Sequence, residues 1–157
     1  FSLFYMRDFG MCIEALLKLG YKKEVEKTLQ FALCVYSTEN RMTTTITKNG
    51  NAFDVFSYAP DSLAFLLYGL RISYNKELVE IYRPFLELQL SHFYNTVYDK
   101  EIIVQKRNFS SIKDHAKREI TCYDSCCVAV VAREAELLGL HNPFTDNGFS
   151  YNKYKRK

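Results

Sequence analysis

Apolar residues recur at three- and four-residue spacing along much of the chain, which is typical of helices that bury one face. The predicted helices cover residues 8–19, 23–37, 61–72, 76–97 and 124–138. Gly20 and Gly139 directly follow two of these segments, and glycine commonly ends a helix in the left-handed conformation. Pro84 lies inside the fourth segment, where proline is expected to kink or break the helix.

The links between the predicted helices indicate how the helices pair. The first link is only a few residues long, so the first two helices are expected to lie antiparallel. A longer link, residues 38–59, is rich in Thr and Asn. Its Asn49-Gly50 dipeptide between β-favouring residues predicts a short β-hairpin within residues 40–58. The predicted fold class is therefore all-α, built from antiparallel helical hairpins.

The composition of the chain limits its class and its partners. Its 157 residues, 48% of them hydrophobic and 25% charged, suffice for one globular domain, which we assign to residues 1–144. Residues 145–157 are expected to form a loose basic tail that carries part of the net charge of +3. No basic stripe elsewhere indicates a nucleic-acid partner, and no apolar run is long enough to span a membrane. The first residue is Phe1, as expected of a fragment or a processed product.

The five cysteines bear on metal binding and on the cellular compartment. The spacing of Cys122, Cys126 and Cys127 does not match the paired Cys or His ligands of a zinc site. We therefore predict no metal and no cofactor. An odd number of cysteines without a disulfide-rich pattern indicates reduced thiols in a cytoplasmic protein.

Alternate predicted helices each open at an aspartate, namely Asp8, Asp61 and Asp124, with a tyrosine within three residues. In stacked antiparallel pairs, alternate helices point the same way, so their N-terminal ends gather at one end of the domain. Carboxylates, Arg7 and tyrosine rings at such an end are suited to bind the hydroxyl groups and the apolar face of a sugar. The alternative is that each Asp only caps its own helix, a common role for this residue.

Two segments resemble a known enzyme family. Residues 4–8 followed by residues 14–21 resemble the Arg-Asp signature of the six-hairpin glycosidases, especially the glucoamylase-like enzymes. In that family an aromatic run and Arg-Asp open an inner helix of an (α/α)6 toroid. Residues 57–64 are similar to a second family segment, whose Asp opens the next inner helix. The resemblance implies a partial α/α toroid in which Arg7 and Asp8 hold sugar hydroxyls beside the cleaved bond.

The resemblance and the helix starts together give the candidate substrate-binding residues. These are Arg7, Asp8, Tyr58, Asp61 and Tyr123. The family's general acid is a Glu just ahead of the third inner helix. Aligning by the helix end at Gly139 brings Glu119 near that place, whereas aligning by the Tyr-Asp dipeptide at the helix start brings Cys127 there. In the second alignment Asp124 is the nearest carboxyl, so Glu119 and Asp124 are the alternative catalytic candidates. Asp114 is a further candidate for the pocket.

Three functional hypotheses follow. The first is a glycoside hydrolase domain that cleaves α-linked glucosides of an oligo- or polysaccharide with inversion. The resemblance places the catalytic base of such an enzyme beyond this chain, and five helices are too few to close the toroid, so we expect a longer chain or a second copy.

The second hypothesis is a noncatalytic helical module that binds sugar or acts as a scaffold. The chain has no Trp, whereas the sugar pockets of that family commonly use one, so the chain departs from the family pattern here. The third is a half-toroid that forms a homo-oligomer through exposed helix faces.

Overall fold

The computed structural model describes residues 2–55, 58–109 and 119–149, and this part of the chain is mainly helical, as predicted. Its helices are α1 (Met6–Lys18), α2 (Lys22–Thr38), α3 (Pro60–Ile72), α4 (Lys76–Ile81), α5 (Arg83–Val97), α6 (Cys122–Leu137) and α7 (Pro143–Asp146). Its strands are β1 (Leu3–Phe4), β2 (Thr45–Thr47), β3 (Ala52–Phe53), β4 (Tyr98–Asp99) and β5 (Ile103–Val104). None of the described helices is long and apolar enough to cross a membrane.

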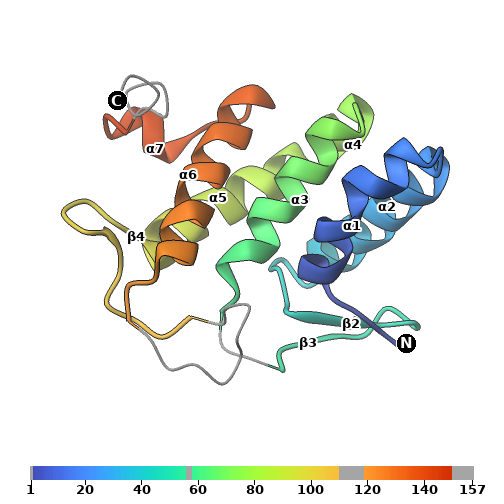
Figure 1. Cartoon of the computed structure of the whole chain (residues 1–157), viewed down its shortest axis with the longest axis horizontal. Helices are drawn as coiled ribbons and strands as arrows, with labels where there is room; N and C mark the ends of the chain where they lie inside the picture. The colour runs from blue at the N-terminus through green and yellow to red at the C-terminus, as the bar shows by residue number, and fades with distance from the viewer. Residues whose placement is uncertain (1, 56–57, 110–118, 150–157) are drawn as a thin grey trace.

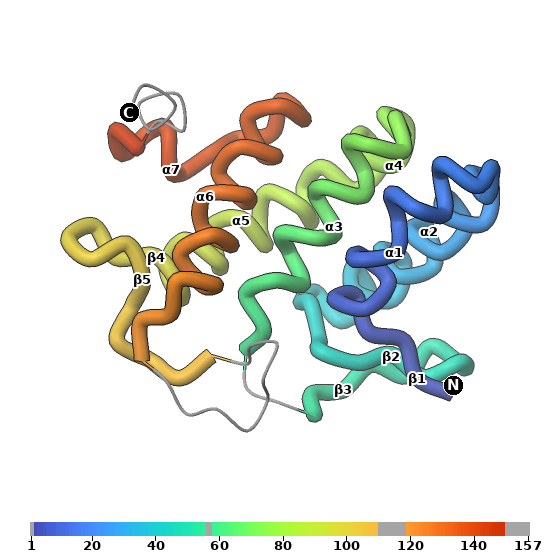
Figure 2. Tube along the Cα trace, viewed as in Figure 1, coloured from blue at the N-terminus to red at the C-terminus, as the bar shows by residue number. Residues whose placement is uncertain are grey.

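The longer helices form two layers. Helices α1, α3 and α6 lie side by side and run in the same direction, while α2 and α5 run the opposite way behind them (Figures 1 and 2). Helix α3 is the centre of the front layer, because its most extensive contacts are with α6 and α1. The N-terminal ends of the three front helices therefore lie at one end of the molecule, as the antiparallel pairing of the sequence predicts.

The sequence of α3 explains its central place. Leucines at helical spacing form one apolar stripe, and small residues such as Ala64 and Gly69 occupy other faces, so the helix is apolar on nearly all sides. A helix of that kind is stable only when it is surrounded by other elements. Most of α3 is indeed buried, including Asp61 and Ser62 in its first turn. These two polar residues of α3 therefore need protein partners or a ligand.

Two predicted boundaries differ from the structure. The segment predicted as one helix over 76–97 is two helices, α4 and α5, which are separated at Tyr82. The break expected at Pro84 is present: this residue lies in the first turn of α5, where its missing N–H would have no helical partner in any case, so it starts a new helix. The tail predicted to begin at 145 is partly packed, because the ring of Phe149 lies 5.7 Å from that of Phe144. Residues 150–157 of this tail lie outside the described residues.

The predicted hairpin within residues 40–58 is present and carries a third strand. Strands β2 and β3 pair antiparallel, with Ile46 opposite Ala52, and Gly50 adopts a positive φ of 81° in the turn. Strand β1, which the sequence pattern did not predict, pairs with the other edge of β2, with Phe4 opposite Ile46. The small sheet therefore joins the start of α1 to the link that leads into α3.

Glycines allow α1 and α3 to approach closely. A Cβ atom built on Gly10 would lie 2.3 Å from the Cβ of Phe65, and one built on Gly69 would lie 2.6 Å from the Cδ1 of Ile13. Both distances are too short for a real contact. The two neighbours differ, however, because the Cβ of Phe65 is fixed to the α3 backbone, whereas the Cδ1 of Ile13 is the end of a rotatable side chain.

We expect Gly10→Ala to lower the free energy of unfolding by about 1–3 kcal/mol, because the new methyl group forces α1 and α3 apart. Gly69→Ala is the matched control and should cost less, since Ile13 can change rotamer and alanine favours the helix by about 1 kcal/mol. Urea denaturation followed by circular dichroism measures both values. A Gly10→Ala protein as stable as the wild type would contradict the close approach of the two helices.

Candidate functional site

The shared N-terminal end of the front layer carries an ionic cluster, which we call the helix-end cluster. It contains Arg7 of α1, Asp61 of α3, and Tyr123 and Asp124 of α6. The Nε of Arg7 donates to Oδ2 of Asp61, and its Nη2 lies 3.5 Å from Oδ1. The hydroxyl group of Tyr123 donates to Oδ2 of Asp61 at 2.7 Å. A single carboxylate therefore holds all three front helices together.

Burial makes these contacts important for stability. The side chain of Asp61 is only 1% exposed and that of Arg7 14% exposed. A carboxylate removed from water in this way is costly unless charged and polar donors replace its hydration. Arg7 supplies a forked, charge-assisted pair of contacts, and Tyr123 adds a third donor. Burial and the neighbouring Asp61 carboxylate raise the pKa of the Tyr123 hydroxyl, so this group remains a donor.

Asp124 lies beside this ion pair and is completely buried. Thr121 is the N-cap of α6, and its hydroxyl oxygen accepts the backbone N–H of Asp124 at 3.0 Å. The same hydroxyl donates to Oδ2 of Asp124 at 2.8 Å. The other carboxyl oxygen, Oδ1, has no hydrogen-bond partner within the described part of the chain. Burial raises the pKa of Asp124, as does the nearby Asp61, whereas the Thr121 hydrogen bond and Arg7 lower it.

The alternative that each Asp caps its own helix is wrong. The N-cap residues of α1, α3 and α6 are Tyr5, Ala59 and Thr121. Each Asp lies inside the first turn of its helix, and the carboxylate of Asp61 reaches two other helices. A carboxylate in the first turn still interacts favourably with the helix dipole, which is consistent with all three positions.

Not all the predicted site residues join the helix-end cluster. Asp8 is exposed in the first turn of α1, next to Arg7. Glu119 is exposed and precedes the N-cap of α6 by two residues. Tyr58 packs on the rings of His92 and Phe109, at centroid distances of 5.5 and 6.2 Å, and so lies in a different place. Asp114 lies outside the described residues.

The structure adds two residues to this site that were not among the predicted site residues. Thr121 orients Asp124, and its spacing of three residues before an acidic side chain is a recognisable sign of a helix start. Cys127, which is 5% exposed, lies close enough that burial together with Asp61 and Asp124 raises the pKa of its thiol. Its place beside two carboxylates depends on packing between α3 and α6, which no local pattern encodes.

A cavity between α3 and α6 opens beside the helix-end cluster. It has a volume of about 260 Å³, and its lining includes Asp61, Phe65, Tyr68, Tyr123 and Cys127. The lining is mostly aromatic and apolar, with Asp61 and Tyr123 next to the cluster and Arg133 on a later turn of α6. Asp61 and Tyr123 line this cavity, whereas Asp124 does not.

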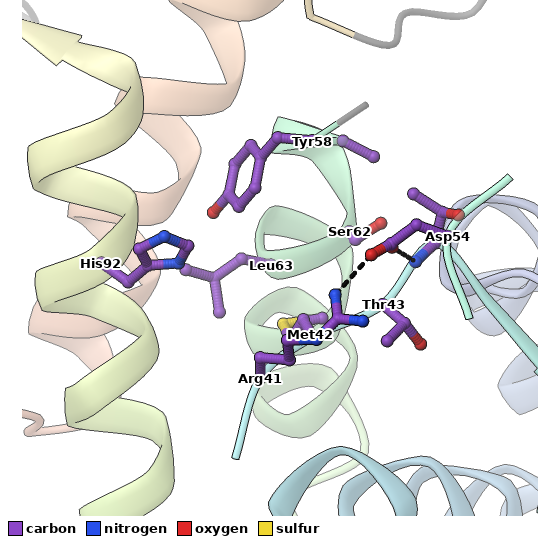
Figure 3. A pocket seen from close by; sticks show the side chains of 10 residues that line it. Arg41, Met42, Thr43, Asp54, Tyr58, Ser62, Leu63 and His92 are labelled. Atoms are coloured by element: carbon purple, nitrogen blue, oxygen red, sulfur yellow. Dashed lines mark hydrogen bonds and ion pairs between the residues drawn. The ribbon is translucent and has the colours of Figure 1, made fainter. Parts of the chain in front are cut away.

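A second, separate pocket lies on the other side of the first turn of α3. It has a volume of about 160 Å³ and lies between the link after α2, the first turn of α3, and α5. Figure 3 shows Tyr58 and His92 on one side of this pocket and the ion pair of Arg41 and Asp54 on the other. Tyr58, which was predicted to share the site of the aspartates, belongs to this second pocket.

Comparison of the chain with known protein families, with curated proteins and with solved structures gave no match.

Replacing Arg7 by Met should lower the free energy of unfolding by about 3–5 kcal/mol, because it leaves the Asp61 carboxylate buried without its charged partner. The double variant Arg7→Met/Asp61→Leu should recover part of this loss, since it removes both charges. Chemical denaturation of the wild type, both single variants and the double variant gives the coupling energy. The exposed pair of Arg41 and Asp54 is the control, and Arg41→Met should cost at most about 1 kcal/mol.

Removing the hydroxyl group of Tyr123 should cost about 1.5–3 kcal/mol of stability, the range for a hydrogen bond to a charged group. Tyr123→Phe keeps the ring and so isolates this contact. Tyr21→Phe is the matched control, because Tyr21 is exposed and should be neutral to this change. Thermal unfolding of the two variants measures the difference, and equal melting temperatures would show that the contact with Asp61 is not made in solution.

Proposed function

We propose that this chain is a saccharide-binding part of a glucoamylase-like glycoside hydrolase, built as a portion of an α/α toroid. The observation that carries the proposal is the meeting of Arg7, Asp61, Tyr123 and Asp124 at the shared N-terminal end of three parallel helices. The front layer would be the inner layer of the toroid, and α2 and α5 would belong to its outer layer. The resemblance of residues 4–8 and 57–64 to that enzyme family supports the same assignment.

The proposed roles of the residues follow from their exposure. Asp8 is exposed beside Arg7 and would accept hydrogen bonds from sugar hydroxyl groups. Tyr123 and the cavity beside it would contact the apolar face of the sugar. Arg7 and Asp61 would hold the three helix ends in place, since their charges are directed at each other.

Exposure also separates the two candidate acids. A general acid has to reach the oxygen of the leaving sugar, and Asp124 is completely buried. Glu119 is exposed just ahead of α6. We therefore assign the general acid to Glu119 and a positioning role in the first turn of α6 to Asp124.

Calorimetric titration with maltose and isomaltose tests saccharide binding. We expect Asp8→Asn to weaken binding about tenfold, the loss expected for a hydrogen bond to a charged acceptor. Glu24→Gln is the matched control: Glu24 is an exposed acid in the first turn of α2, which points the opposite way. The proposal fails if the wild type binds neither sugar, or if the two variants bind equally well.

Hydrolysis is tested separately by the turnover of the same two sugars, in the longer chain or homo-oligomer that would supply the catalytic base. Glu119→Gln should abolish turnover with little effect on sugar binding, because it removes only the transferable proton. Asp124→Asn should retain a measurable rate. Turnover that survives Glu119→Gln would rule out the proposed acid without affecting the binding assignment.

A noncatalytic scaffold is the second candidate function, and one observation favours it. Both oxygens of Asp61 are engaged by Arg7 and Tyr123, so this carboxylate already serves to join helices. A scaffold of this kind would bind neither sugar and would show the same stability losses in the variants of the helix-end cluster. The sugar titration therefore separates the two candidates.

A further inference from the structure

The pocket behind the first turn of α3 is a built site of its own. Residues from four places in the sequence line it, including Thr43, Asp54, Ser62 and His92. Figure 3 shows their side chains around one hollow, with His92 projecting from α5 and Ser62 from α3. Asp61 and Ser62 are adjacent in α3, yet the first belongs to the helix-end cluster and the second to this pocket. The two sites are therefore distinct.

Three polar side chains lining this pocket lack partners. The side chain of Ser62 belongs to a residue only 6% exposed, and its hydroxyl makes no hydrogen bond within the described residues. The hydroxyl of the half-buried Tyr58 and the imidazole of the exposed His92 likewise make none there. Burial raises the pKa of Tyr58, so its hydroxyl is a donor. Because these groups are open to water, a ligand that enters the pocket can replace that water and form hydrogen bonds with them.

The charges around the pocket cancel. Arg41 contacts Oδ2 of Asp54, and the other oxygen of Asp54 accepts the backbone N–H of Thr44 at 2.9 Å. This hydrogen bond and the ion pair fix the carboxylate at the wall of the pocket. Each charge of this pair is compensated by the other, so the pair adds no net charge that would favour an anion or a cation. The pocket is suited to a neutral ligand.

The size and the apolar wall of the pocket limit the ligand further. Its volume of about 160 Å³ is room for about five water molecules, close to the size of one sugar ring. Met42, Ala59 and Leu63 form an apolar wall, and the hydroxyl groups of Tyr58 and Ser62 are on the polar side. A ligand with C–H groups on one face and hydroxyl groups at its edge matches both walls. Hydroxyl groups of a ligand both donate and accept hydrogen bonds, so they can pair with the hydroxyls of Tyr58 and Ser62 and with the imidazole of His92.

We propose that the pocket formed by Thr43, Tyr58, Ser62 and His92 binds a small neutral polyol of monosaccharide size. This site does not depend on the proposed saccharide site at the helix-end cluster. It is too small for a disaccharide, and it is reached from the other side of α3.

Ligand-observed nuclear magnetic resonance titration of the full chain with glucose tests the class of ligand. Gluconate and glucosamine serve as the charged controls, because they are of similar size and carry one negative or one positive charge. We expect glucose to bind several-fold more tightly than either. Equal or tighter binding of gluconate or glucosamine would overturn the assignment to a neutral ligand.

Two small substitutions test the place of binding. Tyr58→Phe and Ser62→Ala each remove one hydroxyl and keep the packing, and each should weaken glucose binding about three- to tenfold, as expected for one lost hydrogen bond. Tyr94→Phe is the matched control, since Tyr94 is a half-buried tyrosine of α5 outside the pocket, and it should leave the affinity unchanged.

The variant Asp8→Asn distinguishes the pocket from the helix-end cluster. Glucose binding that is weakened by Tyr58→Phe and unaffected by Asp8→Asn supports the pocket, whatever the disaccharide titrations show. Glucose binding that is weakened only by Asp8→Asn would overturn the pocket and assign the sugar to the helix-end cluster. No detectable glucose binding by the wild type would overturn the pocket as well.

Discussion

The contact between Arg7 and Asp61 sets the arrangement of the front layer, because it crosses between helices that are far apart in the sequence and is removed from water. Asp61 is 1% exposed, and Arg7 and Tyr123 bring α1 and α6 to the same carboxylate of α3. A buried charge tolerates little displacement of its partners, since each lost donor leaves an unsatisfied oxygen. The three helix ends are thus held in one register, and Asp124 is buried beside them.

Close packing between α1 and α3, further along these helices, acts together with the contact between Arg7 and Asp61. Gly10 and Gly69 let α1 and α3 lie so near each other that a Cβ atom at either position would overlap a side chain. A second buried carboxylate, Glu134 of α6, is bound by Arg71 of α3. Helix α3 is therefore joined to its neighbours by an ion pair near each end, with close apolar packing between them.

The first turn of α3 separates two polar regions with different characters. Asp61 faces α1 and α6, where charged partners already satisfy its oxygens. Ser62 faces the link after α2 and α5, where its hydroxyl and that of Tyr58 make no hydrogen bond to other described residues. The first region is thus mainly a joint between helices, with Asp8 and the cavity beside Tyr123 as its accessible parts. The second region carries the hydroxyl groups on which the proposed polyol site rests.

The sequence alone determined the longer helices, their direction and the hairpin between β2 and β3, because apolar spacing, glycine and short links act over a few residues. It also placed the aspartates at helix starts, which puts Asp61 and Asp124 at one end of the layer. Tertiary structure decided that Tyr58 points into a separate pocket, that Thr121 rather than Asp124 caps α6, and that Cys127 lies beside two carboxylates. These facts depend on which face of α3 meets each neighbour, and that is fixed only when distant segments pack together.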